Sequence, residues 1–197
     1  MQTYRPQSLL IIFFFFISLF TLVSCGSNRQ DETALAPAQI IPVKDTKAAD
    51  TKFLSYATDA YFHEILLAKL AQQRASDPEV KELGRVIEET SRASKSQITG
   101  MAMSKSITVP TAPSEAANIA YDTLGKIAMD EFDFIYLRQF IQRHNDLVVE
   151  FENAAREDHD ADIQSWASGK VSELRSQLSK AKELDARVNP VSDLVQE

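Results

Sequence analysis

The chain has 197 residues, of which 44% are hydrophobic and 25% charged, and its formal net charge is −7 at pH 7. Five glycines and seven prolines are too few for a collagen-like or low-complexity chain, or for a β-sandwich with frequent turns. The single cysteine excludes an internal disulfide and a cysteine-rich zinc site, and an acidic chain without a basic patch lacks the footprint of a nucleic-acid-binding protein. The composition therefore predicts one helical domain of modest size, and the sequence contains no complete set of catalytic residues.

Residues 1–24 are predicted to be a secretory signal peptide. An apolar run, LLIIFFFFISLFTLV at residues 9–23, follows Arg5. At about 1.5 Å per residue the run makes a helix of roughly 22 Å, which is shorter than the ~30 Å hydrocarbon core that a permanent span must cross. We therefore expect a cleavable signal, and the alternative is an uncleaved anchor with a buried thiol.

The end of this segment, Leu22-Val23-Ser24-Cys25, resembles a bacterial lipobox, in which the cysteine is acylated and becomes the new N-terminus. Cleavage before Cys25 removes one charged residue, Arg5, and leaves a net charge of −8. Because an acidic chain is repelled by anionic lipid, attachment must come from acyl chains such as palmitate, each buried methylene contributing about 0.8 kcal/mol. Lipoproteins that are retained at the inner membrane often have Asp directly after the acylated cysteine. This chain has Gly26 at that position, which favours attachment to the periplasmic face of the outer membrane.

Residues 25–49 are predicted to be a flexible tether. They are polar, contain Pro37 and Pro42, and show no sustained apolar period. A soft linker of this length holds a domain about 25–30 Å from its attachment point on average. A short tail, residues 189–197, begins at Asn189-Pro190 and ends the chain.

Between tether and tail the sequence predicts four long helices and one short one. Asp77 is a good N-cap and Pro78 a good first-turn residue, so the first long helix ends and the second begins there. The prolines of SKSITVPTAP and the polar segment EDHDAD mark two further breaks. The predicted helices span residues 51–76, 78–103, 114–124, 130–157 and 161–188.

The connections predict the topology. Helices one and two, and helices three and four, are joined tightly enough to be antiparallel neighbours, whereas residues 104–129 can travel the length of a bundle. The expected fold is therefore an all-α, ferritin-like four-helix bundle over residues 50–188, with one long crossover between helices two and three.

Each long helix carries one polar residue on its predicted apolar stripe: Glu64, Ser91, His144 and Gln177. Unpaired buried polar groups cost roughly 1–3 kcal/mol each, so we expect the four to meet in one central cavity. Bundle cores also bind metals, but Ser and Gln are poor ligands, which leaves Glu64 and His144 as weak candidates. We therefore expect no cofactor and no bound transition metal.

Two further polar positions can be interpreted from their neighbours. Asp133 and Tyr136 are expected to form a cap or hydrogen bond near the start of the third long helix. His159 lies in the acidic segment EDHDAD and is expected to be a solvated turn residue.

Three stretches carry a family resemblance: FLSYATDAYFHEILLAKLAQQRA, PEVKELGRVIEE and EFDFIYLRQFIQRHNDLVVEFENAA. Through them, residues 50 to about 184 resemble DUF4142, a ferritin-like domain family of unknown function in exported bacterial proteins. Glu64, Phe132-Asp133, Tyr136 and His144 are the most specific matches. The family pattern usually has Asp-His in helix two and a further His in helix four, where this chain has Thr90-Ser91 and Gln177. If those histidines bind metal, the resemblance implies that this chain has lost about half of the set.

Three functions remain under consideration. The anchor, the tether and the incomplete ligand set favour a non-enzymatic envelope lipoprotein that binds another envelope protein or stabilises the cell surface. The fold resemblance alone suggests a metal-binding or oxidative-stress protein of ferritin-like type, which is an analogy. A hydrolase using His144 with a nearby serine has no nucleophile spacing to support it.

Overall fold

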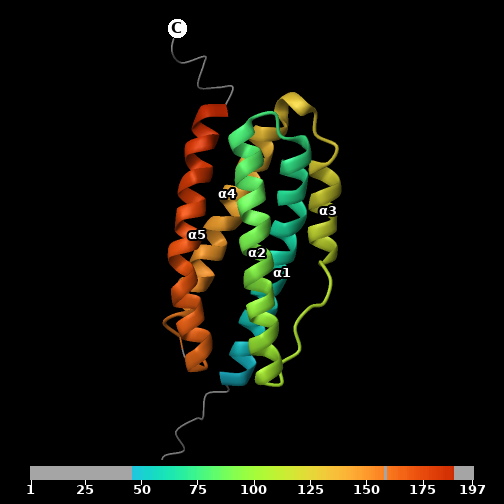
Figure 1. The fold of residues 1–197 in the computed structure, drawn as a ribbon. Coiled ribbons are helices and arrows are strands. Elements are labelled where there is room, and N and C mark those ends of the chain that lie inside the picture. Colours follow the sequence, from blue (N-terminus) through green and yellow to red (C-terminus); the bar gives the residue numbers. More distant parts are fainter. Residues whose placement is uncertain (1–45, 158, 189–197) are drawn as a thin grey trace, which may run out of the picture. The chain divides into compact units, whose positions relative to one another are not determined.

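The structure, a computed structural model, describes residues 46–157 and 159–188. The predicted signal peptide, Cys25, most of the predicted tether and the tail therefore lie outside the described residues. The described part contains five helices and no strand, as the all-α prediction requires (Figure 1): α1 (Thr46–Arg74), α2 (Pro78–Ser104), α3 (Glu115–Leu124), α4 (Met129–Ala154) and α5 (Ala161–Val188). None of these five helices combines the length and the apolar content that a membrane span needs.

Three of the five predicted helices, α2, α3 and α5, keep both boundaries to within one residue, and α1 and α4 do not. α1 begins at Thr46 rather than at residue 51 and so includes the end of the predicted tether. The early turn is stable because Asp50 is buried and its Oδ1 binds His159 Nδ1 at 2.8 Å. α4 ends at Ala154, three residues before the predicted end.

The helix ends follow from local sequence. Asp77 caps α2, since its Oδ1 accepts hydrogen bonds from the backbone N–H groups of Glu79 at 2.7 Å and Val80 at 3.3 Å. α2 ends in a Schellman motif, in which Ile107 N–H donates to the Ala102 carbonyl at 2.8 Å. This motif needs a left-handed residue, and Ser106 supplies it with a φ of 52°.

The two tight connections make antiparallel pairs, α1 with α2 and α4 with α5, and the pairs pack through α1 against α4 and α2 against α5. The chain returns along the bundle through residues 105–128, so α2 and α4 run in the same direction, as the predicted crossover requires (Figure 1). α3 lies in this return segment and packs on α1 and α4. As a result α1 is covered on three sides: 14 of its 29 residues are buried, against 7 of 28 in α5.

α1 and α2 approach closely at Gly84. A Cβ atom there would lie 2.9 Å from the Ala68 carbonyl oxygen and 3.0 Å from the Ala71 Cβ. Only glycine fits this contact without a shift of the backbone.

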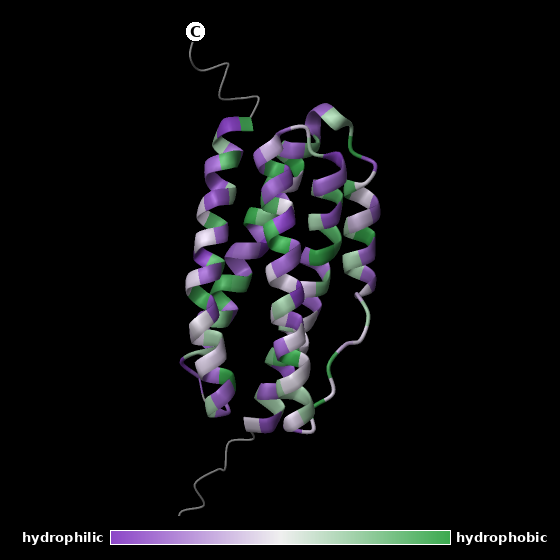
Figure 2. Ribbon diagram, in the orientation of Figure 1, coloured by the Kyte–Doolittle hydropathy of each residue, from purple (hydrophilic) through white to green (hydrophobic). Residues whose placement is uncertain are grey.

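The interior contains two apolar clusters. One is built around Phe53, Tyr61, Ile98, Phe151 and Leu174, and the other around Leu67, Ile87, Phe132, Phe140 and Leu184. Hydrophobic and hydrophilic residues are interspersed along every helix (Figure 2), as expected for helices with one buried face and one exposed face. Glu64, Ser91, His144 and Gln177 each fall in the sequence between a residue of one cluster and a residue of the other, so a polar layer separates the two clusters.

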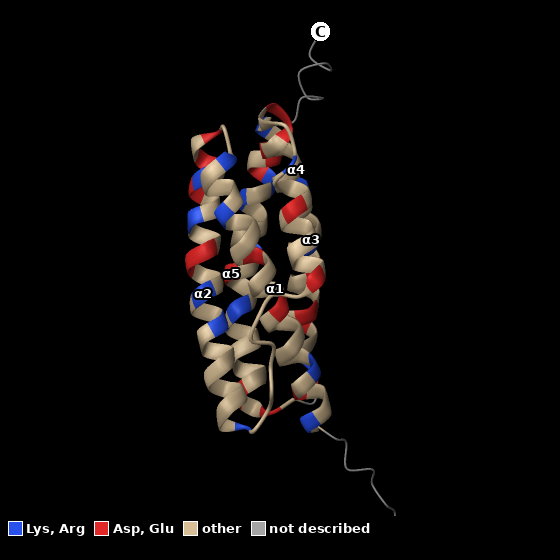
Figure 3. Cartoon of the chain, turned by 90° about the vertical axis from the view of Figure 1, so that its right-hand side faces the viewer, with Lys and Arg blue, Asp and Glu red and all other residues tan. Residues whose placement is uncertain are grey.

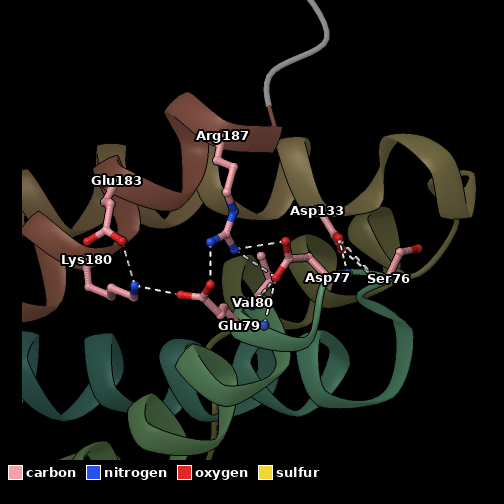
Figure 4. A network of polar contacts seen from close by, with 8 residues as sticks. All are labelled: Ser76, Asp77, Glu79, Val80, Asp133, Lys180, Glu183 and Arg187. Atoms are coloured by element: carbon pink, nitrogen blue, oxygen red, sulfur yellow. Dashed lines mark hydrogen bonds and ion pairs between the residues drawn. The ribbon is translucent and has the colours of Figure 1, made fainter.

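At one end of the bundle a polar network joins the α1–α2 turn to α4 and α5 (Figure 4). The Asp133 carboxylate accepts hydrogen bonds from the backbone N–H groups of Ser76 at 2.9 Å and Asp77 at 2.7 Å. Arg187 pairs with both oxygens of Asp77 and with Glu79. Asp133 therefore forms the expected hydrogen bond near the start of α4, with the α1–α2 turn as its partner, whereas the Tyr136 hydroxyl, expected to take part, is buried without a hydrogen-bond partner among the described residues.

Candidate functional site

The candidate site is the centre of the polar layer, where Glu64 links three helices. Its Oε2 accepts a hydrogen bond from Ser91 Oγ of α2 at 2.7 Å, and its Oε1 lies 2.8 Å from Nδ1 of His144 of α4. All three side chains are buried, and His144 is 0% exposed. Because an ionised carboxylate only accepts hydrogen bonds, the Nδ1 of His144 donates to it.

Aromatic side chains of α4 hold the imidazole in place. Phe132, Tyr136, Phe140 and His144 recur at intervals of four residues, so they lie along one face of the helix. Neighbouring ring centroids are 6.2, 6.2 and 4.4 Å apart along this series. The Phe140 ring stacks on the imidazole, and the second ring nitrogen, Nε2, is buried without a hydrogen-bond partner.

The negative charge of Glu64 affects the tyrosines of the core. Burial raises the pKa of the Tyr136 hydroxyl, and the Glu64 charge raises this pKa further. The pKa of Tyr61 is raised for the same two reasons, again with burial as the larger. Both phenols therefore stay protonated at physiological pH.

A cavity of about 190 Å³ reaches Glu64 from the surface between α1 and α4. Its lining includes Tyr56, Arg143 and Asp146 as well as Glu64. Small solutes can therefore reach the edge of the carboxylate, whereas His144 lies behind it.

Gln177 does not join this cluster. Its Nε2 donates to Thr90 Oγ1 at 2.9 Å, and its side chain lines a separate cavity of about 300 Å³ between α2 and α5. The expectation of one cavity shared by all four residues was therefore wrong. The physical reason is that α5 packs on α2 and α4, so the long Gln177 side chain meets α2 before it can reach Glu64 on α1.

Two acidic residues of the neighbouring helices, Glu88 of α2 and Asp133 of α4, are engaged elsewhere. Glu88 accepts hydrogen bonds from Gln72 and Arg92, and Asp133 binds the α1–α2 turn. Among the described residues no three His, Cys, Asp or Glu side chains form a group that could hold a metal ion. Glu64 and His144 bind each other at 2.8 Å, an arrangement that fits a hydrogen-bonded pair.

Two buried histidines were not found by sequence reasoning. His159 was expected to be solvated, but its side chain is only 5% exposed and pairs with Asp50. The sequence did contain a signal for the burial of Asp50, which lies three residues before Phe53 on the same helical stripe. His63 is 4% exposed and its Nε2 has no partner. Burial, with the Arg143 charge as the second cause, lowers the pKa of His63 to about 4.

The fold and the polar layer define an all-α helical domain whose interior is cross-linked by a Glu–Ser–His cluster. The sequence profile of the "Domain of unknown function (DUF4142)" matches residues 36–184. The chain belongs to this family. The match begins before Asp50, where the resemblance was expected to start, and ends at the expected residue.

Solved structures of similar fold include "CopM in the Cu(I)-bound form", with a TM-score of 0.58 and 21% identity over 68% of this chain and 93% of that one. A conserved hypothetical protein, Rv2844 from Mycobacterium tuberculosis, has a TM-score of 0.56 and 17% identity over 70% of this chain and 97% of that one. At these identities the likeness concerns the fold alone. Comparison with the curated proteins gives no match.

Proposed function

We propose that this DUF4142 protein is a lipid-anchored protein of the bacterial envelope with a non-enzymatic binding or structural role. The observation that carries the proposal is the use of both Glu64 oxygens by Ser91 and His144, which makes the polar centre a cross-link between α1, α2 and α4. With its central groups bonded to one another, the domain offers its surfaces to a partner, and we propose that this partner is another envelope protein.

The anchor in this proposal is Cys25, acylated after cleavage of residues 1–24 and placed on the periplasmic side of the outer membrane. The lipobox-like residues before Cys25 and the glycine after it support this assignment. Nucleic acid is not a partner in this proposal, since the chain carries a net charge of −7 and Lys and Arg are interspersed with Asp and Glu on the face drawn in Figure 3.

Substitution of the cysteine tests the anchor. A Cys25→Ser chain should accumulate as an uncleaved or soluble form, whereas the natural chain should fractionate with outer membranes and carry radiolabelled palmitate. Membrane fractionation of a cleaved Cys25→Ser chain would show that another anchor exists and would refute the proposal.

A second candidate is a metal-binding or oxidative-stress protein of ferritin-like type with a degenerate site. The crossover between two helical hairpins supports the ferritin-like assignment, and the unpartnered Nε2 of His144 is the observation that favours a metal. Calorimetric titration with zinc, manganese, copper(I) and ferrous iron distinguishes the two candidates. Tight binding that disappears in both His144→Ala and Glu64→Gln favours the metal-binding function; absence of binding, with lower stability in His144→Ala, favours the hydrogen-bonded cross-link.

A further inference from the structure

A further cavity, which shares Arg143 and Asp146 with the cavity that reaches Glu64, lies between α3 and α4. Its volume is about 540 Å³, which is within the ~300–1,000 Å³ typical of small-molecule sites. Figure 3 views the domain from the side on which α3 lies. α3 is fixed there because Ser114, its N-cap, donates through its backbone N–H and its hydroxyl to the Asp59 carboxylate of α1, each at 3.1 Å. The cavity is therefore part of the fold and not a gap beside a loose segment.

One wall of the cavity carries the positive charge of Arg143, which forms no ion pair within the described part of the chain although Asp146 lines the same cavity. Arg143 of α4 lines the cavity and makes no hydrogen bond or ion pair with any of the described residues. The side-chain amides of Gln139 and Gln142 line the same wall and can also donate hydrogen bonds. A guanidinium with neighbouring amide donors is the arrangement that binds a carboxylate.

His63 of α1 also lines the cavity, and its imidazole is 4% exposed with an unpartnered nitrogen. Since its pKa is lowered to about 4 by burial and by Arg143, the ring is neutral at physiological pH. A neutral ring can form a hydrogen bond with a ligand without adding a second full charge to the site.

The opposite wall, from α3, is mainly apolar. It consists of Ala116, Ile119, Ala120 and Thr123, and Ile119 is 57% exposed although it is a large hydrophobic residue. These small and aliphatic side chains leave room for a hydrocarbon group and contribute no competing charge. Asp146 is the one acidic residue of the lining, and its negative charge opposes a doubly charged anion such as phosphate more than a single carboxylate.

We propose that the cavity between α3 and α4 binds a small amphiphilic monocarboxylate, with the carboxylate on Arg143 and the hydrocarbon part against Ile119. The proposal does not rest on the function proposed for the whole chain, because Glu64, Ser91 and His144 do not line this cavity and the anchor plays no part in binding.

Ligand titration of the full chain tests this site. The chain, in nanodiscs of zwitterionic lipid and labelled on isoleucine methyl groups, is titrated with hexanoate, and the methyl signal of Ile119 is followed. Hexan-1-ol and hexylammonium are the neutral and cationic probes of matched length. We expect a saturable shift with hexanoate, and binding at least tenfold weaker for the other two.

The variant Arg143→Gln should weaken hexanoate binding at least tenfold. Arg156→Gln, which removes an exposed arginine of the α4–α5 corner outside the cavity lining, should leave it unchanged. The methyl spectrum of each variant shows whether the fold is kept. A shift that does not saturate, equal binding of the three probes, or equal effects of the two variants would overturn the proposal.

Discussion

The buried imidazole of His63 should make the protein less stable in acid. Its pKa falls from 6.5 to about 4 because the side chain is buried and Arg143 lies nearby, while Asp59 and Glu64 act in the opposite direction. Below pH 6.5 the unfolded chain binds a proton that the folded chain does not accept until about pH 4. The free energy of unfolding therefore decreases as the pH falls from 6.5 to about 4. Below about pH 4, His63 causes no further decrease.

The size of the effect follows from the shift. At ~1.36 kcal/mol per pKa unit, the largest loss of unfolding free energy that the His63 shift can cause is about 3 kcal/mol. The open cavity beside His63 brings water near the ring and screens the charge, so we expect about 2 kcal/mol.

Comparison with His63→Leu isolates this contribution, because all other titrating groups are shared. We expect the variant to gain about 2 kcal/mol relative to the natural chain between pH 7.5 and pH 4, measured by urea denaturation followed by circular dichroism at 222 nm. The comparison at pH 7.5 reports the packing effect of leucine alone and serves as the reference. Parallel stability curves for the two chains over this range would refute the reasoning.

Three further substitutions, one of them with a matched control, test the fold. His144→Ala should lower the free energy of unfolding by about 3 kcal/mol in urea, since it leaves a cavity and strands the Glu64 carboxylate; a loss below 1 kcal/mol would contradict the cross-link. Ser106→Gly should raise the free energy of unfolding by about 1 kcal/mol, and with it the melting temperature, because glycine adopts the left-handed conformation without strain. An unchanged melting temperature would show that the turn is unstrained. Gly84→Ala should lower the free energy of unfolding by more than about 1 kcal/mol. The control Gly100→Ala, where a Cβ meets no atom within 4 Å, should raise it by up to about 1 kcal/mol. Equal effects of the two substitutions would disprove the close approach of α1 and α2.

Much of the fold could be predicted because its signals are local. Asp77-Pro78 marks a helix start by hydrogen-bond chemistry and ring geometry, and the structure has α2 beginning at Pro78. The inward positions of Glu64 and His144 follow from the 3.6-residue period, and both are buried. These features depend on neighbours within two turns of one helix, so a single sequence contains them.

The rest depends on which helices are neighbours, and a single sequence does not contain that. Gln177 is buried as its period predicts, yet it meets Thr90 because α5 lies diagonally across the bundle from α1. The burial of His63 arises from α3, which covers a side of α1 that the apolar stripe leaves out. His159 is buried because a turn at one end of the fold meets Asp50 more than one hundred residues earlier.

The covering of α1 by three helices has a consequence for how the domain opens. Opening of α5 exposes a helix with seven buried residues, whereas release of α1 exposes fourteen and detaches α2, α3 and α4 from a shared surface. We therefore expect the backbone amides in the middle of α1 to exchange with solvent only in the globally unfolded chain, and those of α5 to exchange also through local opening. Substitutions should accordingly be tolerated better in α5, which packs on α2 and α4, than in α1, which packs on α2, α3 and α4.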